Sequence, residues 1–200
     1  MTFNELVEAV ITNTNRPELL RETKLAVQRS TIKMHQLDFF SNDLTQGSIS
    51  FTPAINPRID TTQLGKGFRK LAAIQASIGK GSFQTLGPID LMTAMETKGQ
   101  VGYTTIGGSI VIQSGGLSVG QLIFNYYTNP VVDESGFNSW VANNHPFAII
   151  DDASAAVLYS VGNTERGNFF ANLVGAKLPR PSGHVAEILG NNEIGYIQPE

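Results

Sequence analysis

The N-terminal residues constrain the fold most, because their apolar side chains recur at the spacing of a single helix face. Thr2 and Glu5 stand where a capping box would satisfy the free amides at the start of a helix. The pattern predicts a helix over residues 2–13 that needs a partner surface for its apolar stripe, formed by Phe3, Leu6, Val7, Val10 and Ile11.

A second helix is predicted over residues 17–37, with Pro17 in the first turn, where its missing N–H is tolerated. Its apolar residues form two seams rather than one. A helix with two seams is expected to pack within its own subunit and also against a neighbouring subunit. The predicted subunit-packing residues are Leu20, Val27 and Met34 on one seam, and Leu25 and Ile32 on the other.

From Phe39 onward, Gly, Pro and Asn separate short β-prone runs, which predicts a strand-rich insertion over about residues 47–128. Strands are expected over 48–51, 69–77 and 121–128. The clearest element is a hairpin over 102–113, in which Gly107 and Gly108 supply the positive φ angles that a tight turn requires.

Helices are predicted again over residues 146–161 and 164–175, after which Pro179 and Pro181 prevent regular continuation. The expected fold class is α+β. Its N- and C-terminal helices form a helical bundle around a central antiparallel strand-rich region. We expect one domain with one core over residues 1–177 and an extended C-terminal arm over residues 178–200.

The composition excludes several classes of protein. Charged residues make up only 16% of the chain and the net charge is −3, which argues against a protein that grips nucleic acid through its phosphates. The absence of cysteine excludes disulfides and thiolate metal sites. No apolar run approaches the length that spans a bilayer and no signal peptide precedes the first helix, so we expect a soluble chain without a membrane partner.

The sequence contains only weak motifs for phosphate binding, metal binding or catalysis. The segments 65–67 and 79–81 read Gly-Lys-Gly and lack the spacing of a phosphate loop. His35, His145 and His184 are too far apart in sequence to support a local zinc site. Asp151 and Asp152 are adjacent and point about 100° apart on a helix. We therefore expect no enzyme, no metal and no cofactor.

Two alternatives from other functional classes stay open. An enzyme would depend on His145 together with Asp151 or Asp152. A ligand- or glycan-binding module would use exposed aromatic side chains around Tyr103 and Trp140, although core or subunit-contact roles are the commoner use of such residues.

The chain resembles the head-to-tail adaptor (head completion) proteins of tailed bacteriophages, especially those with short tails. The resemblance runs from Met1 to about Lys177 and is weakest in the middle. It is carried by the segments 1–7, 14–19, 22–23, 26–27, 35–40, 125–127, 130–132 and 137–140, by Thr31 and Pro146, and by the helix over 153–162.

This resemblance implies a structural virion protein, made in the host cytoplasm, that forms a homo-oligomeric ring, usually dodecameric, under the portal protein. The ring would connect the portal to the tail or nozzle protein, and DNA would pass through its channel without sequence-specific binding. The expected portal-binding arm carries Ile188, Leu189, Ile194 and Tyr196. Another neck or tail-completion protein is the alternative within the same structural class.

Overall fold

The computed structural model describes residues 1–65, 67–79, 82–90 and 99–176, and it divides them into two compact units. We call the first the helical unit, which comprises Met1–Asp43 and the chain from Asn129 to residue 176. The second is the β unit, Leu44–Thr128. The fold class is thus α+β with antiparallel sheets, as predicted. The start of the expected insertion, about residue 47, lies at Leu44, and its end lies at Thr128 as expected.

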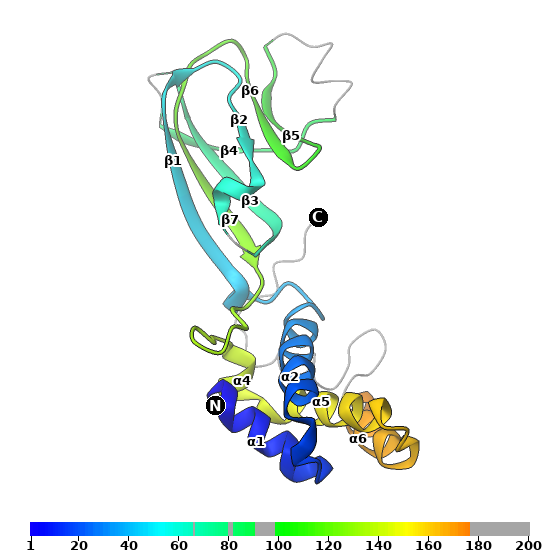
Figure 1. Ribbon diagram of the computed structural model, residues 1–200. Helices are drawn as coiled ribbons and strands as arrows, with labels where there is room; N and C mark the ends of the chain where they lie inside the picture. Colours follow the sequence, from blue (N-terminus) through cyan, green and yellow to red (C-terminus); the bar gives the residue numbers. More distant parts are fainter. Residues whose placement is uncertain (66, 80–81, 91–98, 177–200) are drawn as a thin grey trace. The chain divides into compact units, whose positions relative to one another are not determined.

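Five α-helices form the helical unit (Figure 1): α1 (Phe3–Thr14), α2 (Leu20–His35), α4 (Trp140–Asn144), α5 (Pro146–Ser160) and α6 (Thr164–Ala176). The capping box predicted at the start of α1 is confirmed, since Thr2 and Glu5 bond to each other's backbone amides. The helix ends at Asn15, whose φ of 54° is left-handed. The helix expected over 17–37 instead begins as a 3₁₀ turn, η1 (Pro17–Leu19), and α2 ends at His35.

The core of the helical unit lies where α5 packs against α1 and α2. The apolar stripe of α1 is buried there, as its spacing predicted. A smaller apolar cluster joins α5 to α6 through Ala155, Leu158 and Phe170. The main cluster contains Phe3, Leu6, Val7, Val10, Ala26, Val27, Met34, Phe40, Val141, Ala142, Ala148, Ile149, Ala153, Val157 and Val174.

The β unit contains two antiparallel sheets (Figure 1). The larger has the strand order β1-β7-β3-β4 and the smaller the order β2-β6-β5. The strands are β1 (Leu44–Ala54), β2 (Arg58–Asp60), β3 (Phe68–Ile78), β4 (Phe83–Leu86), β5 (Val101–Ile106), β6 (Ser109–Ser114) and β7 (Val119–Thr128). The 3₁₀ turn η3 (Thr61–Leu64) follows β2.

The predicted hairpin is confirmed as β5 and β6, and its turn residues Gly107 and Gly108 have φ angles of 53° and 78°. Strand β7 alternates as expected, with Leu122, Phe124 and Tyr126 buried on one face. Strands β2 and β4 were not predicted. They have three and four residues, too few for an alternating pattern to stand out.

The expectation of a single core is wrong. Buried apolar residues of the β unit form a cluster of their own, which includes Ile59, Ile74, Ile110, Leu122 and Phe124. The cluster of the β unit is formed by its own strands, and the main cluster of the helical unit is formed by its helices and the chain beside them. Each unit therefore has a main core of its own within one sequence of 200 residues.

Candidate functional site

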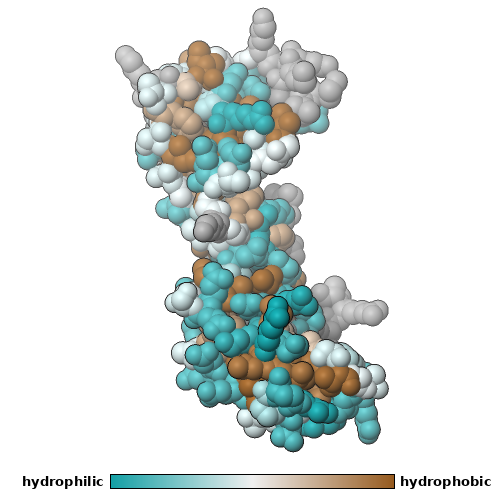
Figure 2. Space-filling model, in the orientation of Figure 1, coloured by the Kyte–Doolittle hydropathy of each residue, from teal (hydrophilic) through white to brown (hydrophobic). Residues whose placement is uncertain are grey.

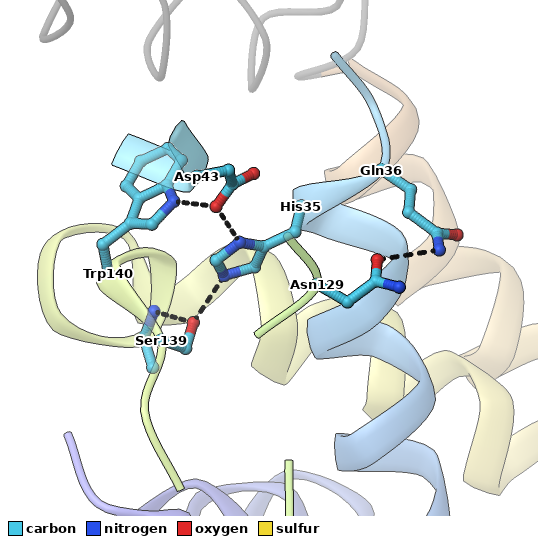
Figure 3. A network of polar contacts seen from close by, with 7 residues as sticks. His35, Gln36, Asp43, Asn129, Ser139 and Trp140 are labelled. Atoms are coloured by element: carbon cyan, nitrogen blue, oxygen red, sulfur yellow. Dashed lines mark hydrogen bonds and ion pairs between the residues drawn. The ribbon is translucent and has the colours of Figure 1, made fainter. Parts of the chain in front are cut away.

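A buried hydrogen-bond network lies in the helical unit and joins four side chains (Figure 3). The Nδ1 atom of His35 lies 2.6 Å from Oδ1 of Asp43, and the Nε2 atom lies 2.9 Å from Oγ of Ser139. The indole N–H of Trp140 donates to the same Asp43 oxygen over 2.8 Å. Because a carboxylate oxygen accepts, the hydrogen between His35 and Asp43 is assigned to Nδ1.

Local structure places each member of this network. His35 is the last residue of α2, and Asp43 ends the 3₁₀ turn η2 (Ser41–Asp43). Ser139 is the N-cap of α4, and its hydroxyl accepts a hydrogen bond from the Ala142 amide at 3.1 Å. Trp140 packs edge-on against His35, with ring centroids 5.5 Å apart. The network therefore fixes the end of α2, the start of α4 and the chain between α2 and β1 to one another.

The Ser139–His35–Asp43 arrangement has the hydrogen-bond order of a hydrolytic triad. Its burial argues against that chemistry, because the exposed fractions of the three residues are 3%, 1% and 5%. The serine hydroxyl also serves as a helix cap. A nucleophile must reach a substrate, so we interpret this network as structural: it stabilises the packing of the helical unit.

Sequence reasoning missed this network because its members are up to 105 residues apart. His35 is the histidine of this network, and His184 lies outside the described residues. The one local signal was Ser139, a good N-cap residue three positions before the Ala142 amide that it binds.

The second candidate site is an exposed side of α2, which we call the α2 outer face: Leu20, Arg21, Leu25 and Arg29. Leu20 is 46% exposed and Leu25 is 43% exposed. Two shallow grooves, of about 250 and 590 Å³, meet at Leu25, which lines both. Figure 2 shows apolar residues gathered on the helical unit over α2, α5 and α6, with hydrophilic residues around them. Such a patch on a weakly charged chain is typical of a surface that meets another protein.

The predicted subunit-packing residues divide between the two sides of α2. Val27 and Met34 are fully buried in the core of the helical unit, and Ile32 is half-buried. Val27 and Met34 thus belong to that core. Leu20 and Leu25 belong to the α2 outer face. The predicted arm residues Ile188, Leu189, Ile194 and Tyr196 lie outside the described residues.

Of the residues in the enzyme alternative, Asp152 faces α2, and His145 and Asp151 are buried. Asp152 accepts a hydrogen bond from Ser30 at 2.7 Å and forms an ion pair with Lys33, so its carboxylate is directed toward α2. Both aspartates lie in the second turn of α5, which begins at Pro146 as predicted. His145 is 7% exposed and Asp151 is 8% exposed.

The residues of the glycan alternative belong to different units. Tyr103 packs against the core of the β unit, and burial raises the pKa of its hydroxyl. Trp140 packs against the core of the helical unit and donates its indole N–H to Asp43. Both rings are half-buried and engaged in their own units, which disfavours an open stacking platform.

The described residues contain neither a candidate metal site nor a candidate membrane span. No group of three or more His, Asp or Glu side chains in this part of the chain is placed to hold a metal ion. None of its helices combines the length and apolar character that crossing a bilayer demands.

Compared with known proteins, the sequence matches no family model and no curated protein.

Proposed function

We propose that this chain is a head-to-tail adaptor of a tailed bacteriophage of the short-tailed type. It would form a dodecameric ring that docks under the portal protein, connects it to the tail or nozzle protein, and leaves a central channel for DNA ejection. It acts as a structural virion protein at the head–tail junction, without catalysis, after synthesis in the host cytoplasm. The resemblance over residues 1–177 motivates the proposal.

The α2 outer face carries the proposal, because it holds two apolar side chains that the helical unit leaves exposed. Leu25 lies between Arg21 and Arg29, one helical turn away on each side, while the opposite side of α2 is core. An exposed leucine alone is ordinary. Two such leucines beside two grooves on one helix are suited to contact with a neighbouring subunit.

The buried network adds support. Two of the segments that carry the resemblance, 35–40 and 137–140, meet there through His35, Ser139 and Trp140. Residues that resemble a family and also determine internal packing favour a shared fold of the helical unit.

The remaining parts of the proposal concern the roles of the segments. The helices of the helical unit form the ring body as a bundle, and the β unit supplies the contacts to the tail. The arm over residues 178–200 reaches the portal through Ile188, Leu189, Ile194 and Tyr196, as extended segments do when they add main-chain hydrogen bonds and apolar anchors. The net charge of −3 suits a channel from which DNA departs without adhering.

The test mixes the purified chain with portal rings of the phage that encodes it and measures the mass and symmetry of the complex by native mass spectrometry and electron microscopy. We expect a ring of adaptor copies on each portal. A chain ending at Lys177 should keep its fold, judged by circular dichroism, and lose portal binding. Normal docking by the truncated chain would show that the arm assignment is wrong.

A matched pair of leucine variants tests the ring contact. Leu25→Asp is expected to prevent ring formation, whereas Leu117→Asp, at a leucine of the β unit that is 55% exposed, should leave it intact. A full-length chain that ignores the portal and binds another neck component would favour the neck or tail-completion alternative. Binding to a glycan array by a stable monomer would favour the glycan-binding module.

A further inference from the structure

The most exposed aromatic side chain of the helical unit lies on α6. Phe169 is 59% exposed, while its neighbour Phe170 is buried against α5. The two phenylalanine rings pack edge-on, with their centroids 5.2 Å apart. Glu165 lies one helical turn before Phe169 and is exposed. The exposed side of α6 thus presents an aromatic ring next to a carboxylate.

The α2 outer face presents the complementary pattern. Leu25 is apolar and lies beside the two grooves, and Arg21 and Arg29 stand one turn before and one turn after it. Within the described part of the chain, no ion pair involves Arg21, Arg29 or Glu165. By contrast, Lys24 and Lys33 are paired with Glu134 and Asp152.

We infer that Phe169 on α6 of one copy docks beside Leu25 on the α2 outer face of the next copy, with Glu165 facing Arg21 or Arg29. This inference rests on the proposed function, since it names the contact that builds the ring. Because an arginine stands on both sides of Leu25, Glu165 meets a guanidinium whether the two helices run parallel or antiparallel. The charges therefore agree for either direction of crossing.

The two patches cannot cover each other within one copy, because both remain exposed on the same helical unit. A contact between different patches of identical subunits is heterologous, so each copy donates one patch and receives one, and closure gives a ring. Pairing of two α2 outer faces across a twofold axis is less favourable, since Arg21 of one copy would approach Arg29 of the other. On α2, Glu22 offsets part of the positive charge of the two arginines. On α6, the guanidinium of Arg166 donates a hydrogen bond to the Asn13 carbonyl of α1.

The chain has no cysteine, so introduced cysteines give an unambiguous cross-linking test. Leu25→Cys and Phe169→Cys are made singly and together, and each protein is treated with oxidant or a short bis-maleimide, both free and mixed with portal rings. A disulfide requires Cβ atoms about 4 Å apart, and the bis-maleimide accepts wider spacing. We expect the double variant to give a ladder of covalent multimers on denaturing gels.

The single variants decide between the two kinds of contact. Neither should cross-link alone, whereas an equal mixture of the two should give covalent dimers with one copy of each. Dimers of Leu25→Cys alone would overturn the inference in favour of a twofold contact. A ring on the portal without cross-links in the double variant would also overturn it, while leaving the proposed function standing. A ladder without portal binding would support the contact and contradict the proposed function.

If the unmodified chain forms no portal complex and the double variant forms no ladder, both the contact and the function are wrong. Charge exchange supplies a second measurement that needs no cross-linker. Phe169→Ser should weaken assembly at least about tenfold, as removal of an aromatic anchor does. Glu165→Arg should weaken it up to about fivefold, and the combination with Arg21→Glu and Arg29→Glu should restore it. Weakening without restoration would contradict the pairing of these charges.

Discussion

The two units of this protein are held together in different ways. Among the described residues, the helical unit buries ten polar or charged side chains and the β unit buries three, Thr104, Ser109 and Ser114. The β unit has backbone ladders along its sheets and a core of large apolar residues. In the helical unit, side-chain hydrogen bonds connect segments that are more than 100 residues apart. Neighbouring strands are joined directly by backbone hydrogen bonds, whereas helices, whose backbone bonds are internal, meet through their side chains.

The largest expected effect separates the two cores. Phe124 is fully buried in the β unit, and Phe124→Ala should destabilise that unit by about 3–5 kcal/mol, as truncation of a core phenylalanine does. Hydrogen-exchange mass spectrometry should show lost protection in β1, β3 and β7 and none in α1, α2 or α5. Ile123→Ala, at the next residue on the less buried face, is the control and should cost much less. Equal loss of protection in the helices would contradict the division into two units.

A smaller effect tests the buried network. His35→Ala removes the histidine partner of the Asp43 carboxylate and should destabilise the helical unit by about 3 kcal/mol. The β unit should keep its exchange protection. The control is Gln36→Ala, at the residue that follows His35. It removes an exposed hydrogen bond to Asn129 and should change stability by less than about 1 kcal/mol. If the two variants behave alike, the network does not stabilise the helical unit.

The smallest effect is a pH dependence with one contributor in each unit. The Thr2 amide lowers the pKa of Glu5 in the helical unit, and the Thr62 amide lowers the pKa of Asp60 in the β unit. A carboxyl whose pKa is lower in the folded state stabilises that state above its ordinary pKa. The contribution is lost as the pH falls through the lowered value.

Thermal unfolding between pH 7 and pH 2.5 should therefore show both units losing stability below about pH 4. Glu5→Gln, which keeps a capping-box side chain without the charge, should reduce this loss in the helical unit alone. Asp60→Asn should reduce it in the β unit alone. A pH profile unchanged by both variants would show that these two carboxyls do not govern acid stability.

Local patterns predicted much of the fold. Thr2 and Glu5 defined the start of α1, and the Gly107-Gly108 pair defined the hairpin turn, because in each case neighbouring residues contain the whole interaction. The helical spacing of residues 146–161 likewise predicted α5 with nearly correct bounds. Such signals come from periodicity and caps, which the chain carries within one or two turns.

Periodicity did not reveal which surfaces meet. It marked Val27 and Leu25 as apolar positions of α2, yet the first is core and the second is exposed. It also gave no sign that His35 and Ser139 would meet, since that contact depends on how α4 packs beside α2. The two separate cores were missed for the same reason, because alternation shows that a face is buried without naming what covers it.

The β unit begins and ends at neighbouring positions, since Leu44 and Tyr127 are paired across β1 and β7. Such a pair lies about 5 Å apart, a gap that a short linker spans. A segment whose ends meet can be removed or replaced in one piece while the rest of the chain keeps its packing. Recombination at the codons that flank Asp43 and Asn129 would therefore exchange the β unit as one cassette.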